Sequence, residues 1–250
     1  KGWSGPINKI EIDEQWAQRL NSTFINTDYE NWQIAVAIRT TGGGAEIGFS
    51  DGTTGRINSV PGALKAGDII AVSPLGGSNF RLENVPEVSG GMVVQNPRNG
   101  RVWAMQGGFD DRMSSFNRAT QAERQPGSTI KPFVYATALD QGMTPATLIA
   151  DEPFCVYQSA ALGRKCFQNF GNSRGAGEQT LRWGVEQSRN LMTVRAANDA
   201  GMENVVKTIK TMGIGDYKPY LAFALGAGDT TVMKLTNAYS MLANHGRELQ

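Results

Sequence analysis

The chain has 250 residues, and its 24 Lys and Arg nearly balance its 23 Asp and Glu, which gives a formal net charge of +1. This balance leaves no basic footprint for nucleic acid, and a hydrophobic share of 40% together with 30 Gly excludes a disordered or collagen-like chain. The longest aliphatic stretch, Ile34 to Ile38, is far too short for a membrane-spanning helix.

Residues 1–33 contain one helical pattern. Ile12, Trp16 and Leu20 recur every four residues, and Asp13 stands near the start of the pattern. The first residues show no initiator Met, basic region or apolar targeting segment. We therefore expect a linker segment with one short helix, within a longer polypeptide.

Short β-rich runs follow from residue 34 to residue 88, separated by clusters of Gly, Pro and Asp. These runs are Ile34–Ile38, Ala45–Phe49, Asp68–Val72 and Asn79–Leu82. Their spacing predicts a small antiparallel barrel or sandwich. The Ser89-Gly90-Gly91 cluster places a domain boundary near residue 88.

The part from residue 89 to residue 250 begins with a hairpin pattern and then changes to a helical period. The hairpin combines Met92–Gln95 with Arg101–Met105. The predicted helices are Ser128–Asp140, Leu181–Gln187, Leu191–Ala200, Met202–Met212 and Thr231–Ala243. The second part is therefore expected to be mostly helical around a sheet, which makes the fold class α+β.

Two features bear on redox state and metals. Cys155 and Cys166 could close a short disulfide loop in an oxidising compartment, or they could be two separate buried thiols, and the residues leave both open. The chain has one His, His245, and no Cys-x-x-Cys or His-Glu-x-x-His pattern. We expect no metal and no cofactor.

Ser128 and Lys131 form the first candidate for chemistry. Their three-residue spacing places both on one face of the first helical turn. A serine hydroxyl is a weak nucleophile until a neighbour takes its proton, and a desolvated lysine can do so. A Ser-x-x-Lys tetrad often arises by chance, so the tetrad alone is weak evidence.

Ser188 and Asn190 form the second candidate, in a turn between two predicted helices. Their hydroxyl and amide could relay a proton and hold a substrate amide. Ser115-Phe116-Asn117 has the same Ser-x-Asn pattern. Ser188 is favoured because it follows the Ser-x-x-Lys tetrad, sixty residues downstream of Ser128, whereas Ser115 precedes it.

The chain resembles the class A penicillin-binding proteins of the 1A type over most of residues 85–250. The stretches that carry the resemblance to their transpeptidase domain are Asn96–Val102, Gly107–Asp110, Phe116–Ala119, Arg124–Ser128, Leu225–Gly228, Ala238-Tyr239 and Ala243–Gly246. The β-rich part is similar, more weakly, to the oligonucleotide-fold-like (OB-like) domain of 1A-type proteins from Gram-negative bacteria. Gly2–Pro6 is similar to the linker that precedes that domain.

The resemblance implies a peptidoglycan D,D-transpeptidase. Ser128 would attack the penultimate D-Ala of a stem peptide ending in D-Ala-D-Ala, with Lys131 as general base. Ser188 would relay a proton to the leaving group, and Asn190 would contact the substrate. β-Lactams would acylate Ser128. The implied location is the periplasmic face of the inner membrane, with the anchor outside this sequence, and the β-rich domain would be a candidate site for a regulatory protein.

The family's third motif, Lys-Thr/Ser-Gly, is absent from the sequence. Lys210–Gly213 is a near match in a helical context, which excludes it. That motif supplies a cation, a hydroxyl and a neighbouring oxyanion donor, and losing one such donor typically lowers the rate by roughly 10² to 10³. We therefore expect the protein to continue beyond Gln250, with a transpeptidase domain that is incomplete here.

Two alternatives stay open. A serine β-lactamase or glutaminase shares the Ser-x-x-Lys arrangement, and it would differ by fast hydrolysis of the acyl-enzyme. A non-catalytic module that binds peptidoglycan or protein, with a vestigial tetrad, is supported by the missing third motif. A Ser128 that does not react with β-lactams in the intact protein would favour the second alternative.

Overall fold

The computed structural model describes residues 3–23, 25, 31–86, 88–109, 115–159 and 163–249. Gly2, Asp110 and Gln250, which entered the sequence predictions, lie outside these ranges. The chain divides into two compact units, Lys1–Gly91 with Gln106–Asn117 and Met92–Met105 with Arg118–Gln250. The domain limits at residues 33 and 88 stay predictions. No described helix is both long and apolar enough to cross a membrane.

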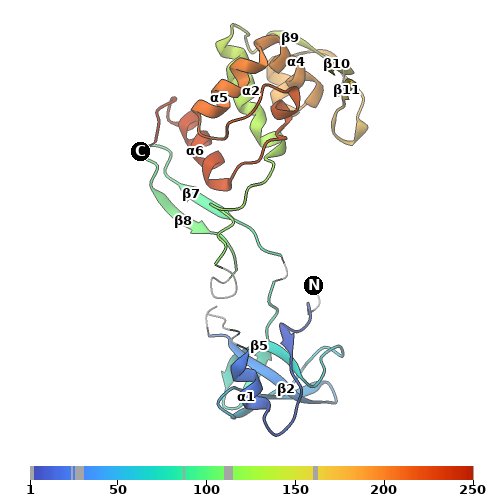
Figure 1. Cartoon of the computed structure of the whole chain (residues 1–250), viewed down its shortest axis with the longest axis vertical. Helices are drawn as coiled ribbons and strands as arrows, with labels where there is room; N and C mark the ends of the chain where they lie inside the picture. The colour runs from blue at the N-terminus through green and yellow to red at the C-terminus, as the bar shows by residue number, and fades with distance from the viewer. Residues whose placement is uncertain are drawn as a thin grey trace. The chain divides into compact units, whose positions relative to one another are not determined.

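The first unit is built from strands and one short helix (Figure 1). Its elements are β1 (Asn8–Lys9), α1 (Trp16–Ser22), β2 (Gln33–Thr41), β3 (Gly44–Gly48), β4 (Thr54–Ile57), β5 (Asp68–Gly76) and β6 (Asn79–Leu82). The four predicted strands and the predicted helix are confirmed. Strand β4 was missed because Gly55 stands where an apolar side chain would signal a strand. The Phe80 ring fills that place, 2.6 Å from where a Cβ of residue 55 would lie.

The five longer strands close into one sheet. Strand β5 pairs with β2 and with β6, while β2, β3, β4 and β6 follow one another in the order of pairing. All these pairs are antiparallel except β4 with β6. An all-antiparallel arrangement was expected, but strand direction cannot alternate around a closed ring of five, so one pair must be parallel.

The closed sheet encloses one core and packs its outer face on α1. The buried interior residues are Ala35, Ala37, Ala45, Ile47, Ile57, Leu64, Ile70 and Val72. On the other face, Leu20 of α1 packs with Val36 and Ile69, and Trp16 joins them. Alternate residues of β2 and β5 therefore serve different cores, as the two-residue period of a strand requires.

The second unit is mainly helical. Its elements are β7 (Met92–Gln95), β8 (Val102–Gln106), η1 (Gly127–Ile130), α2 (Lys131–Asp140), β9 (Leu148–Asp151), β10 (Phe154–Ser159), β11 (Gly163–Phe167), η2 (Phe170–Asn172), β12 (Gly177–Thr180), α3 (Leu181–Glu186), α4 (Asn190–Ala200), α5 (Met202–Thr211), η3 (Leu221–Leu225) and α6 (Val232–Ala243), where η marks a 3₁₀-helix. The hairpin and the five predicted helices are confirmed, with one difference. Residues 127–130 form a 3₁₀ turn that leads into α2.

Helix α2 lies at the centre of this unit and packs on α3, α4 and α5 (Figure 1). Its buried residues Phe133 and Val134 join the core of α5 and α6, while Tyr135 and Ala138 join the core of α3 and α4. Within the described residues, the strands of this unit form three separate two-stranded sheets, β7–β8, β9–β12 and β10–β11. The helices therefore pack on one another here, rather than around the single sheet that was expected.

The two cysteines form a disulfide. Cys155 of β10 and Cys166 of β11 are directly paired across the antiparallel hairpin, and their Sγ atoms are bonded. The bond joins neighbouring strands of a short hairpin at the edge of the helical cluster (Figure 1).

Candidate active site

Ser128 and Lys131 lie at the junction of η1 and α2. The turn begins at Gly127, whose φ of +57° falls in the left-handed region that glycine adopts most readily. Pro132 is the second residue of α2, where its missing N–H breaks no helical hydrogen bond. Ser128 is exposed, whereas Lys131 is only 3% exposed. The junction therefore presents the hydroxyl outward and buries the amine.

The turn η1 is held from its far side by the end of η3 and by α6. Gly226 has φ +79°, and a Cβ there would lie 2.3 Å from the carbonyl oxygen of Gly127. The Tyr239 hydroxyl donates a 2.8 Å hydrogen bond to the carbonyl of Thr129, and its ring packs edge-on against Phe133. The stretches around Gly226 and Tyr239 entered the sequence analysis only through the family resemblance. In the structure, both contact η1 and fix the turn that bears Ser128.

Ser188, Arg189 and Asn190 form the turn between α3 and α4, called here the 188–190 turn. Ser188 has φ +50°, a conformation that non-glycine residues seldom adopt. The Ser188 N–H donates to the carbonyl of Val185, and the Arg189 N–H donates to that of Gly184, each at 3.0 Å. Asn190 then begins α4. The strained residue is therefore fixed by backbone bonds at the end of α3.

The structure brings Lys131 together with the 188–190 turn. The Lys131 Nζ donates to the Ser188 carbonyl at 2.6 Å, to the Ser188 Oγ at 3.1 Å and to the Asn190 Oδ1 at 2.7 Å. An ammonium has three protons, so these three acceptors use all of them. Ser128 shares the helical face of Lys131 without a side-chain hydrogen bond to any described residue. Three of the four predicted residues are thus in direct contact, and the fourth is adjacent on η1.

The environment of Lys131 lowers its pKa from 10.5 to about 8. Burial is the main cause, because an apolar surrounding disfavours the charged amine, and the nearby positive charge of Arg189 adds to it. The three contacts of the amine are all neutral oxygens, so no carboxylate restores the ordinary value. Near neutral pH, a shift of this size makes the neutral amine roughly three hundred times more abundant than it is in a lysine with the ordinary pKa. Lys131 is therefore suited to accept a proton from a hydroxyl.

Sequence reasoning missed a buried carboxylate beneath the 188–190 turn. Asp151 is fully buried and accepts bonds from Arg189, Asn169 and the N–H of Ala176. Burial alone would raise the pKa of Asp151, but these bonds outweigh burial and hold it below its usual value. No local period in the sequence marks this residue, because its partners lie 18 to 38 positions away.

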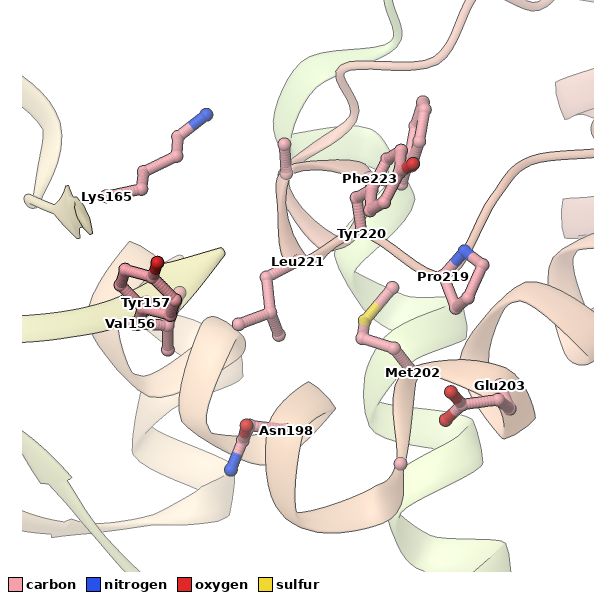
Figure 2. A pocket seen from close by; sticks show the side chains of 12 residues that line it. Val156, Tyr157, Lys165, Asn198, Met202, Glu203, Pro219, Tyr220, Leu221 and Phe223 are labelled. Carbon is pink, nitrogen blue, oxygen red and sulfur yellow. The ribbon is translucent and has the colours of Figure 1, made fainter. Parts of the chain in front are cut away.

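A separate hollow of about 760 Å³ lies over α4, η3 and the disulfide hairpin (Figure 2). Tyr157 and Lys165 of the hairpin face Tyr220 and Phe223 across it, and Glu203 stands at its α5 side. None of the four predicted residues is among the described residues that line it. Within the described part of the chain, no group of three or more His, Cys, Asp or Glu is placed to hold a metal ion.

Comparisons with known proteins show the family of the chain. The family model described as the penicillin binding protein transpeptidase domain matches residues 90–250. The chain is 36% identical over 262 residues to "Penicillin-binding protein 1A" of Rickettsia prowazekii, covering 100% of this chain and 33% of the relative. It is 36% identical over 185 residues to the protein of the same name from Neisseria flavescens, covering 73% and 23%. The chain thus spans about a third or less of the length of these relatives.

Solved structures give the same result. The crystal structure of penicillin-binding protein 1A from Haemophilus influenzae aligns with a TM-score of 0.77 at 29% identity, over 97% of this chain and 38% of that one. The imipenem acyl-enzyme of penicillin-binding protein A from M. tuberculosis aligns with a TM-score of 0.54 at 16% identity, over 64% and 48%, which shows a shared fold. Lys131 and the 188–190 turn thus lie inside the range matched by the transpeptidase family model. The chain belongs to the penicillin-binding protein transpeptidase family.

Proposed function

We propose that this chain carries the serine acyl-transfer site of a peptidoglycan D,D-transpeptidase that acts in the periplasm. One observation carries the proposal. Lys131 is a buried amine with a pKa of about 8, three residues from the exposed Ser128 and in hydrogen-bond contact with Ser188 and Asn190. This arrangement activates a hydroxyl and also supplies a route for its proton.

In the acylation step, neutral Lys131 accepts the Ser128 proton as Oγ attacks the carbonyl carbon of the penultimate D-Ala. The C–N bond to the terminal D-Ala then breaks. The departing nitrogen takes a proton that passes from Lys131 through the Ser188 hydroxyl, 3.1 Å away. The products are a Ser128 ester and free D-Ala, and Lys131 is neutral again.

In the second step, an amine of a neighbouring stem peptide attacks the ester carbonyl. Its proton moves to Lys131 and then to the departing Ser128 oxygen, which restores the hydroxyl and leaves a new amide cross-link. Asn190 supports both steps, since its Oδ1 holds the amine and its Nδ2 donates to the carbonyl of Gln168. These two bonds hold the Asn190 amide in one orientation, which supports its proposed contact with the substrate amide.

A β-lactam presents a strained amide in place of the D-Ala-D-Ala bond, and Ser128 would open it to form a stable ester. The names of the Rickettsia and Neisseria relatives support penicillin binding. The first unit adds a finer proposal. Its closed pairing of five strands supports an OB-like domain. We propose that this domain offers a surface to a regulatory protein.

The test is acylation of the full-length protein by a fluorescent penicillin, with the adduct located by peptide mass. We expect one adduct on Ser128, no adduct in Ser128→Ala, and strong suppression in Lys131→Ala. Lys210→Ala and Ser115→Ala are matched controls, because Lys210 pairs with Asp216 on the surface and Ser115 carries the other Ser-x-Asn pattern of the chain, and both variants should label like the wild type. An adduct that persists in Ser128→Ala refutes the assignment of the nucleophile.

The same assay separates the alternatives. An adduct that is lost within seconds by hydrolysis would indicate a β-lactamase. A wild-type protein that is folded and never labelled would indicate a binding module with a vestigial tetrad.

A further inference from the structure

Asp151, at the end of β9, is a fully buried carboxylate with several donors directed at it. Its Oδ1 accepts from Asn169 Nδ2 at 2.9 Å. Its Oδ2 accepts from the Ala176 N–H at 3.0 Å and from Arg189 Nε at 2.8 Å. A buried charge is tolerated only when it is paired and hydrogen-bonded, and Asp151 meets both conditions.

Arg189 is the middle residue of the 188–190 turn, and its side chain leaves the turn toward Asp151. Besides the 2.6 Å ion pair with that carboxylate, it donates to the Arg174 carbonyl at 2.6 Å and to the Ser173 hydroxyl at 3.3 Å. Its guanidinium also lies over the Trp183 ring. A planar group with several donors is held in one orientation by such a set of partners.

Asn169 connects the same carboxylate to the other side of the turn. While its amide nitrogen donates to Asp151, its Oδ1 accepts from the backbone N–H of Leu191 at 3.2 Å. The 188–190 turn is therefore held on one side through the Arg189 side chain and on the other through Leu191. Both attachments end on Asp151.

The turn needs this support, because Ser188 adopts φ +50° and such a conformation persists only where its surroundings fix it. The turn also supplies all three acceptors of Lys131. We propose that Asp151 and Arg189 are positioning residues for acylation, which hold the 188–190 turn and through it the Lys131 amine. This inference rests on the proposed function.

Three further ionisable groups lie on the 188–190 turn, beneath it or on the first turns of α2. Arg189 carries the like charge that helps to lower the pKa of Lys131, and Asp151 faces Arg189. Tyr135, one helical turn after Lys131, has its pKa raised to about 12 by burial and stays neutral below pH 10. A change at Arg189 therefore acts on Lys131 both through geometry and through charge.

The experiment measures the rate of penicillin acylation against pH in the full-length protein, for Arg189→Gln, Arg189→Lys and Asp151→Asn. Arg189→Gln removes both the positive charge and the planar guanidinium with its several donors. We therefore expect acylation to slow by about tenfold to a hundredfold. The rising limb of the plot of acylation rate against pH should move to higher pH. Arg189→Lys keeps the charge but not the planar guanidinium. The acylation rate should therefore fall, while the rising limb of the pH profile stays in place. Asp151→Asn should slow acylation as well.

Asp216→Asn is the matched control, because Asp216 also accepts from a cation at 2.6 Å but on the surface. It should acylate at the wild-type rate. Thermal unfolding identifies any variant that fails to fold. The inference is overturned if folded Arg189→Gln keeps both the wild-type acylation rate and the wild-type pH profile. It is also overturned if Arg189→Lys and Asp151→Asn are both folded and both acylate at the wild-type rate.

A second readout is independent of Ser128. Labelling of Lys131 by acetic anhydride against pH, read by peptide mass, reports the pKa of the amine directly. Arg189→Gln should move this titration to higher pH, and an unmoved titration would contradict the inference. If the wild type itself is never acylated, the proposed function fails, and the titration still decides whether Arg189 acts on Lys131.

Discussion

The Nζ of Lys131 lies 2.7 Å from Oδ1 of Asn190, 59 residues farther along the chain. The acceptor is an amide, which is neutral, so it orients the amine without stabilising its charge as a carboxylate would. An amide rather than a carboxylate at residue 190 therefore leaves the pKa of Lys131 low.

Asn190→Asp tests this relationship. A carboxylate at the same place would raise the pKa of Lys131, and the acylation rate should fall by about tenfold or more near neutral pH. The rising limb of the pH profile should move to higher pH, which stopped-flow acylation can measure. Asn198→Asp, on the exposed side of the same helix, is the control and should leave the profile in place. A profile that Asn190→Asp does not move would mean that residue 190 has no influence on the amine.

The free energy of unfolding should also depend on Lys131. The pKa of Lys131 is about 8 in the folded state, below its ordinary value of 10.5. Between these values the unfolded chain binds more protons, so stability rises with pH across this window, and the penalty is fully present below pH 8.

Lys131→Met removes that rise, which is on the order of 3 kcal/mol at most. The check is urea unfolding of both proteins at pH 7, 8, 9 and 10. Other groups, including Tyr135, are common to both proteins and cancel in the difference. Curves that stay parallel across these pH values would contradict the lowered pKa.

Gly226→Ala should displace the turn that bears Ser128. A Cβ at residue 226 meets the backbone of Gly127 at 2.3 Å and must also adopt φ +79°. We expect a loss of about 3 kcal/mol or more in stability, together with slower acylation.

Gly213→Ala is the matched control, because Gly213 has φ +71° and open space around its Cβ position. It isolates the cost of the backbone conformation, about 1–2 kcal/mol. Equal thermal shifts in the two variants would show that the contact with Gly127 is unimportant.

Reduction of the Cys155–Cys166 bond should destabilise the second unit. The bond closes a loop of 11 residues in sequence separation, for which chain entropy predicts about 3 kcal/mol. The measurement is the urea midpoint with and without reductant, with alkylation to count thiols. Peptide mass after alkylation assigns the thiols to Cys155 and Cys166. An unchanged midpoint after complete alkylation would show that the hairpin needs no covalent closure.

The sequence predicted those elements whose apolar residues repeat over several turns. Helices α4 and α6 follow such a period, and their predicted ends agree with the structure to within one residue. The strands β9 and β12 escaped because each has four residues, and the only buried apolar side chain between them is Ile149 on β9. Short strands of this kind are specified by the neighbour they pair with, which no local pattern contains.

The same limit applies to the site. Ser128, Lys131, Ser188 and Asn190 could be proposed from local spacing and from the family resemblance, and their roles stay predictions. Asp151 could not be proposed, because its importance arises only when the chain brings it against Arg189, 38 residues away. Buried polar contacts between distant segments leave no period in the sequence.

Asn244, at the end of α6, donates a 3.0 Å hydrogen bond to the carbonyl of Pro97 in the β7–β8 hairpin, 147 residues earlier. Helix α6 also packs on β7. During synthesis at about 5–20 residues per second, roughly seven to thirty seconds pass between the hairpin and this partner. The β7–β8 hairpin therefore stays without these contacts until α6 has been made, although the two strands of the hairpin leave the ribosome long before.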